Sequence, residues 1–234
     1  MVIEPSSNSR FRCCKKIASQ RIFEALWDGR LVLPPSERSD LHHLFRSSEF
    51  AADTAGWFFE LLVHQFFRQG PTISLYPILG KLLTTSVRYD DYSASGKIQE
   101  VFTIRLPASD DHRLETETEL RVGRYYRLPA SNFPTIDSLS FTHCHGSPPK
   151  LLMFHVTRNN DRCDVNTGDL DKIDQLLPPG AHAYFVVVTP NGVTPRIEIP
   201  KSYFPGRGSR NPNRTFPVVH WPVDESTLFP HPAG

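Results

Sequence analysis

Residues 135–157 constrain the fold of this chain most strongly, because they predict a pair of strands with a defined register. The stretch TIDSLSFTHCHGSPPKLLMFHVT contains strand-like runs on either side of a turn centred on Gly146. Folding the chain about that glycine brings Asp137 opposite His155, and Thr157 then points to the same side of the sheet as His155. A slip of one residue in the pairing would separate Asp137 from His155.

The hairpin is followed by a helix and a further strand. Residues 168–180, GDLDKIDQLLPPG, carry apolar residues at helical spacing, and Pro178 ends that helix. Residues 183–189, AYFVVVT, form a continuous apolar run, which is typical of a strand buried on both faces. Together with residues 151–157 they predict a β-α-β unit with a right-handed crossover.

The strongest helical pattern of the chain lies upstream, at residues 47–70. It is apolar almost all round, which indicates a buried helix, and Gly70 ends it. Strand-like runs follow it at 72–79, 98–106 and 119–128. We expect a core of the order α-β-β-β-α-β, in the α/β class with a mixed sheet.

The two ends of the chain differ from this predicted core. Residues 1–46 predict a helical extension, with disorder at 1–12 and helices at 17–29 and 38–46. The core spans 47–205 and holds a further possible strand, RIEIP, near its end. Residues 206–234 predict an irregular, Pro-rich tail whose basic stretch, GRGSRNPNR, is either a phosphate contact or a solvated loop.

The composition limits the function classes. A length of 234 residues with 39% hydrophobic content suits one globular domain with irregular ends. A net charge of +1 gives no global basic field, so any surface for nucleic acid must be local. The amino terminus has no apolar signal-peptide core, and no apolar run approaches the roughly 20 residues that cross a bilayer. We expect an intracellular protein of the cytoplasm or nucleus that does not engage a membrane.

Glu60 is the first candidate for chemistry, because it lies within the apolar run WFFELLV. A carboxylate in such surroundings is costly unless it is paired or binds a metal ion. His64 and Arg68 follow at intervals of one helical turn, so they share its face. Glu60 is therefore either a metal ligand or one partner of a structural pair with His64 or Arg68.

Asp137, His155 and Thr157 are the other candidates. Asp is poorly suited to the interior of a strand, so Asp137 either binds a metal or caps a turn after Pro134. His155 could ligate a metal or move a proton, and Thr157 could hold a water or a phosphate oxygen. The alternative is a buried structural histidine beside an ordinary strand threonine.

Three segments follow one another in the order AGWFFELLVHQFFRQG, RYYRLPASNFPTIDSL, and LLMFHVT with LDKIDQLLPPGAHAYFVVV. In this order they resemble the carboxyl-terminal module of fungal Crinkler and retrotransposon-hot-spot proteins. The similarity covers roughly residues 15–205, and each motif is short, so their shared order carries the resemblance. That module is related to the restriction-endonuclease-like, PD-(D/E)XK, fold. Family members often combine it with an upstream NTPase, whereas this sequence has no G-x-x-x-x-G-K-[ST] motif.

The resemblance implies a metal-dependent nuclease site in which Glu60, Asp137 and His155 hold Mg²⁺ and Thr157 orients water. This sequence departs from the pattern at His155-Val156-Thr157, because the nuclease motif has an acid or Gln, any residue, and then Lys. A threonine cannot supply the lysine's positive charge. Lys172, on the following helix, could move into the role.

The sequence therefore predicts a Crinkler or hot-spot-type module directed at DNA or RNA. Its phosphodiesterase activity is expected to be weak or absent because the motif lysine is missing. The alternative is a non-catalytic module for protein interaction that keeps the fold. We expect no cofactor other than Mg²⁺, and that only if the module is active.

Overall fold

The computed structural model describes residues 2–6, 9–16, 40, 52–84, 86–91, 102–114, 119–128, 135–143, 147–158, 163–200 and 216–228. The chain divides into two compact units. The first joins Met1–Val63 to Glu225–Gly234, and the second is His64–Asp224. Helix α3 (Ala52–Arg68) spans the boundary between them.

Within its described residues, the first unit contains β1 (Val2–Ser6), β2 (Ser9–Lys16), the amino-terminal part of α3 and α5 (Glu225–Leu228). Strands β1 and β2 pair in antiparallel fashion. The predicted disorder at residues 1–12 is therefore wrong for these strands, because the two segments satisfy each other's backbone hydrogen bonds. Of the helices predicted at 17–29 and 38–46, only Asp40 lies within the described residues, and it is helical.

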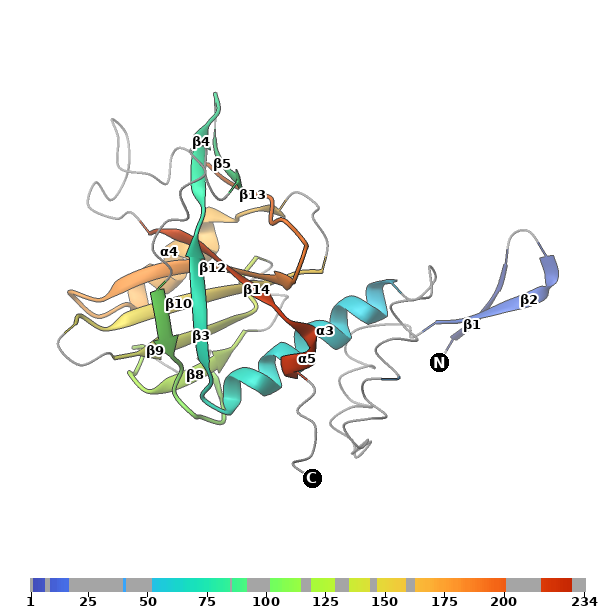
Figure 1. Ribbon diagram of the computed structural model, residues 1–234, viewed down its shortest axis with the longest axis horizontal. Helices are drawn as coiled ribbons and strands as arrows, with labels where there is room; N and C mark the ends of the chain where they lie inside the picture. Colours follow the sequence, from blue (N-terminus) through green and yellow to red (C-terminus); the bar gives the residue numbers. More distant parts are fainter. Residues whose placement is uncertain are drawn as a thin grey trace. The chain divides into compact units, whose positions relative to one another are not determined.

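The second unit is built on a mixed sheet of eight strands, in the order β6-β3-β14-β12-β10-β9-β8-β7 (Figure 1). Its central strands β10, β12 and β14 run parallel to one another, and the pairs β3–β14, β3–β6, β9–β10 and β8–β9 are antiparallel. The bounds are β3 (Thr72–Pro77), β6 (Phe102–Arg105), β7 (Asp111–Arg113), β8 (Arg124–Arg127), β9 (Ser138–Thr142), β10 (Lys150–Val156), β12 (His182–Pro190) and β14 (Val218–Val223). The described residues thus form a mixed α+β fold with few helices, which agrees with the expected class.

The predicted β-α-β unit is present. Helix α4 (Thr167–Leu176) connects β10 to β12, and these two strands pair in parallel from Lys150–His182 to Val156–Val188. The side chain of Asn166 caps the helix by accepting the N–H of Gly168 at 2.9 Å. A buried apolar cluster joins Leu170 and Ile173 of α4 to the sheet, so α4 covers one face of it.

The last turns of α3 that belong to the second unit pack on the same sheet. The Phe67 ring lies 4.3 Å from the ring of Phe154 and 5.3 Å from that of Trp221, measured between centroids. Side chains alternate between faces along a strand, so Phe154 and His155 point to opposite sides. The face that carries Phe154 is therefore the one opposite His155.

A smaller sheet in the order β11-β13-β5-β4 completes the second unit. Its strands are β4 (Leu79–Leu82), β5 (Ser86–Asp91), β11 (Cys163–Asp164) and β13 (Ile197–Pro200). Glu198 of β13 is buried and its Oε1 atom accepts a hydrogen bond from Arg88 Nε at 2.8 Å. The possible strand predicted near residue 200 is confirmed as β13.

Several local predictions were wrong. The supposedly irregular tail contains β14, which lies between β12 and β3 in the large sheet. Residues 111–113, which read as loop, form the short edge strand β7. Strand β5, SVRYDD, was not predicted, because two aspartates end it. Strand β7 has three residues and β14 contains a proline, so the pairing partners of these strands define them more than their own patterns do.

Candidate functional site

The hairpin of β9 and β10 has the predicted register. Lys150 pairs with Thr142, and Phe154 pairs with Ser138. The pairing ends there, and beyond it the Asp137 N–H donates to the carbonyl of Phe154 at 2.8 Å, which keeps Asp137 beside the end of β10. The pairing is centred on position 146, as predicted, and so Asp137 and His155 lie on the face of the sheet that α4 covers.

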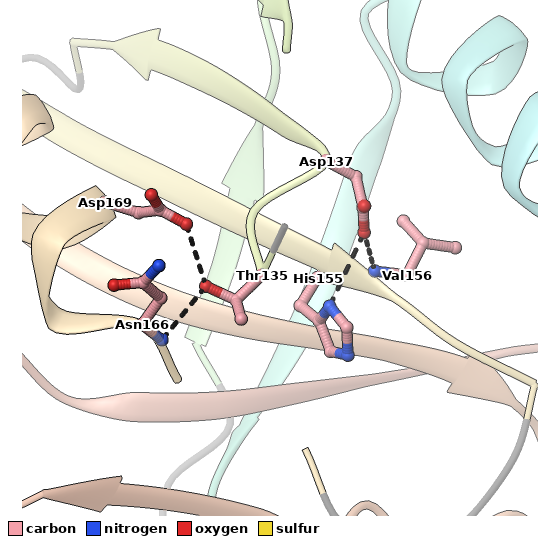
Figure 2. Close-up of polar contacts among 6 residues, drawn as sticks. All are labelled: Thr135, Asp137, His155, Val156, Asn166 and Asp169. Carbon is pink, nitrogen blue, oxygen red and sulfur yellow. Dashed lines mark hydrogen bonds and ion pairs between the residues drawn. The ribbon is translucent and has the colours of Figure 1, made fainter. Parts of the chain in front are cut away.

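Asp137 and His155 are in contact where β9 begins and β10 ends (Figure 2). The Asp137 Oδ2 atom accepts the backbone N–H of Val156 at 2.6 Å and lies 3.6 Å from His155 Nδ1. A separation of 3.6 Å is too long for a hydrogen bond but within the range of an ion pair. Both side chains are largely buried, with 17% and 15% of their surface exposed, so the pair is only partly screened by water.

Thr157 directly follows β10. Its N–H donates to the carbonyl of Val188 at 2.9 Å, so the backbone continues the pairing with β12 for one residue. By strand alternation its half-buried side chain lies on the side of His155. The proposed role of Thr157 in holding water remains a prediction.

Lys172 lies on α4 and contacts a different carboxylate. Its Nζ atom is 3.6 Å from Asp169 Oδ1, and Asp169 is only 1% exposed. The other oxygen of Asp169, Oδ2, accepts the hydroxyl of Thr135 at 3.4 Å. The Thr135 hydroxyl in turn accepts the N–H of Asn166 at 3.3 Å (Figure 2).

The sequence reading missed this cluster of Thr135, Asn166 and Asp169. One part of the cluster has a sequence signature, because an Asn followed three residues later by an acidic residue, as in Asn166 and Asp169, is typical of the start of a helix. The contact to Thr135 has no such signal, since it joins residues far apart in the chain. It ties the start of α4 to the segment that leads into Asp137.

Glu60 is half-buried on the part of α3 that belongs to the first unit. His64, one turn further on, lies in the second unit, where its Nδ1 hydrogen-bonds the Tyr125 hydroxyl. Arg68 lies 3.7 Å from Asp110, and both of those side chains are exposed. Both interpretations of Glu60, as ligand and as structural partner, remain predictions.

A second buried histidine occupies the centre of the large sheet. His220 Nε2 lies 2.8 Å from Thr189 Oγ1, and both residues are 0% exposed. The threonine hydroxyl also lies 2.9 Å from the carbonyl of Val193, to which it donates its proton, so the imidazole Nε2–H is the donor between the two side chains. Burial lowers the pKa of His220 to about 4, which keeps the ring neutral at physiological pH.

No family model, curated protein or solved structure matches this chain. Within the part of the chain that the structure describes, no three His, Cys, Asp or Glu side chains gather closely enough to hold a metal ion. None of the described helices is both long and apolar enough to span a bilayer.

Proposed function

We propose that this chain is a nucleic-acid-directed module of the Crinkler or retrotransposon-hot-spot type, with a restriction-endonuclease-like core and weak or absent metal-dependent phosphodiesterase activity. The observation that carries the proposal is the contact between Asp137 and His155. It joins an acid at the start of one strand to the polar-x-polar segment of the next, on one face of the sheet.

The order of the elements supports the same proposal. Strands β8, β9 and β10 form an antiparallel series, α4 follows, and β12 returns parallel to β10. Helix α3 precedes this series, and β3 to β7 lie between α3 and β8 along the chain. The proposal takes α3, β8, β9, β10, α4 and β12 as the counterparts of the α-β-β-β-α-β core that the resemblance implies. Strands β14, β3 and β6 extend the sheet beyond that core.

The donor set fits a Mg²⁺ ion only in part. Mg²⁺ prefers oxygen ligands in octahedral geometry. Of the three ligands that the resemblance implies, Asp137 and His155 contact each other, but no three such side chains gather among the described residues. One oxygen of Asp137 already accepts the Val156 N–H and faces the His155 ring, which competes with metal binding. We therefore propose Mg²⁺ binding only for a module that keeps weak activity.

The missing lysine supports low activity. Attack on a phosphodiester builds negative charge, which a lysine at the position of Thr157 would offset. Lys172 offers a positive charge from α4, but its ammonium group lies beside the buried carboxylate of Asp169. A non-catalytic protein-interaction module is the second candidate, and it is favoured by the same His155-Val156-Thr157 segment.

Restoring the motif tests the proposal. The His155→Glu/Thr157→Lys double variant should cleave DNA or RNA with Mg²⁺ or Mn²⁺ about 100-fold faster than the unmodified chain, because it regains an acid and a lysine. Adding Asp137→Asn to the double variant should abolish that gain. Adding Asp171→Asn, which removes an exposed acid of α4, should leave the gain intact.

Binding separates the two candidate functions. A nucleic-acid-directed module should bind single- or double-stranded oligonucleotides with an affinity that falls as salt rises. Fluorescence anisotropy at salt concentrations from about 50 to about 200 mM measures how steeply the binding affinity falls with salt. If neither DNA nor RNA binds and the restored motif stays inactive, the protein-interaction function replaces the proposal.

A further inference from the structure

We infer that His155 acts on RNA as a general base through its Nε2 atom, with Asp137 as the positioning residue that holds its ring. The inference rests on the proposed function, namely that the module acts on nucleic acid. It assigns the substrate class, because such a base serves a ribose 2′-hydroxyl and needs no metal ion. It also gives Asp137 a role other than metal ligation.

Asp137 is held from both sides, by β10 and by the residue that follows β8. Its backbone N–H donates to Phe154 O at 2.8 Å, and its backbone carbonyl accepts the Leu128 N–H at 2.9 Å. Its Oδ2 atom accepts the Val156 N–H at 2.6 Å, a short charge-assisted hydrogen bond. A carboxylate fixed in this way is a rigid partner for the imidazole beside it.

The imidazole of His155 presents its two nitrogens to different surroundings. The Nδ1 atom is buried and faces Asp137 Oδ2 at 3.6 Å, whereas 15% of the side chain is exposed. Figure 2 shows the second ring nitrogen, Nε2, turned away from Asp137. The Phe185 ring, 6.4 Å away between centroids, borders the imidazole.

This orientation determines which nitrogen can take up a proton. A neutral imidazole carries one N–H, and the carboxylate of Asp137 favours that hydrogen on Nδ1. Nε2 then holds the lone pair on the side away from the carboxylate. A carboxylate that orients a histidine and stabilises the imidazolium formed during reaction is a recurrent device for general-base catalysis.

The reaction balances without a co-reactant. Nε2 of His155 removes the proton of a ribose 2′-hydroxyl, and the 2′-oxygen forms a bond to the adjacent phosphorus. The bond from phosphorus to the 5′-oxygen breaks, and that oxygen takes a proton from water. The products are a 2′,3′-cyclic phosphate and a 5′-hydroxyl, and the imidazolium returns its proton to solvent.

RNA is the substrate class because DNA has no 2′-hydroxyl. The motif lysine that would position a water is replaced by Thr157, so an external nucleophile lacks support here. A hydroxyl already attached beside the scissile phosphate avoids that need, since it is held close by the substrate itself.

The test uses the full chain, a single-stranded oligoribonucleotide and excess EDTA. We expect slow cleavage that yields 2′,3′-cyclic phosphate ends, and no cleavage of the matching oligonucleotide in which every 2′-hydroxyl is absent. His155→Ala should lower the rate about 100-fold or more, the usual contribution of a general base. Asp137→Asn should lower kcat with little change in KM, because Asp137 orients the base and does not touch the substrate. The control His182→Ala removes an exposed histidine at the start of β12 and should keep full activity.

A folding defect is separated from a chemical one by rescue. Added imidazole should restore part of the activity of His155→Gly, which a merely structural histidine would not show. No cleavage in EDTA by the unmodified chain, or equal cleavage by His155→Ala, would overturn the inference. Cleavage that appears only with Mg²⁺ would overturn it as well but support the metal-dependent form of the proposed function. Loss of nucleic-acid binding would instead remove the proposed function itself.

Discussion

Asp137 and His155 lie 3.6 Å apart, between Asp137 Oδ2 and His155 Nδ1, although they are eighteen positions apart along the chain. Their contact lies directly beyond the pair Phe154–Ser138, with which the register of β9 and β10 ends. The same geometry turns the carboxylate toward the Val156 N–H. The pair is therefore part of the structure of the hairpin as well as a candidate for chemistry.

Replacing Asp137 should destabilise the protein. Asp137→Ala leaves the buried Val156 N–H without its acceptor, and the expected loss is about 1–3 kcal/mol of unfolding free energy. Asp137→Asn keeps an oxygen acceptor and should lose less. Urea denaturation measures both, with Asp171→Ala on the exposed side of α4 as a control that should change stability by less than about 0.5 kcal/mol. Equal stability of Asp137→Ala and the control would contradict a structural role for this hydrogen bond.

Stability should depend on pH through His220. Burial lowers its folded-state pKa to about 4 from 6.5, so between these values the unfolded chain binds a proton that the folded chain excludes. The unfolding free energy therefore has its full value above pH 6.5. It falls by about 3 kcal/mol as the pH drops from 6.5 toward 4. Unfolding free energies across this range should fall less steeply in His220→Gln, which cannot titrate. The same slope in both proteins would count against this assignment.

The buried pair of Glu198 and Arg88 should respond unequally to loss of either partner. The side chain of Glu198 is 4% exposed, whereas that of Arg88 is 27% exposed. Arg88→Met leaves a charge in the interior and should cost about 3–5 kcal/mol. Glu198→Gln leaves a guanidinium that reaches water and keeps an acceptor for Ser86, so it should cost less. Chemical denaturation of both variants decides the order, with the exposed Glu119→Gln as the control.

Alanine substitutions at two glycines with positive φ distinguish the cost of backbone strain from the cost of a steric clash. Gly70 follows α3 with φ 69°, and a methyl group there would lie 2.6 Å from the Ala108 nitrogen. Gly123 has φ 84°, but a methyl group there meets no atom within 4 Å. Gly123→Ala should therefore cost about 1–2 kcal/mol, the penalty of the left-handed conformation alone. Gly70→Ala should cost more, and thermal melts that rank the two variants the other way would contradict the packing argument.

The local elements were predictable because their patterns are local. The apolar run around Val186 and the helical spacing up to Leu176 predicted β12 and α4. The register of β9 and β10 followed from the position of the turn. Strand β14 was not predicted, because VVHWPV contains Pro222 and lies in a proline-rich part of the sequence. Only its neighbours β12 and β3 give its backbone groups partners and bury its side chains.

By itself, the sequence determined the hairpin, the β-α-β unit and the facing of Asp137 and His155, because strand alternation and turn position act over a few residues. Tertiary structure alone decided that β14 completes the central parallel strands and that Lys172 meets the buried Asp169. It also decided that Asp137 accepts the Val156 N–H and that Thr135 ties its segment to α4. These contacts depend on the angles and distances at which separate elements pack, and no pattern within one element encodes them.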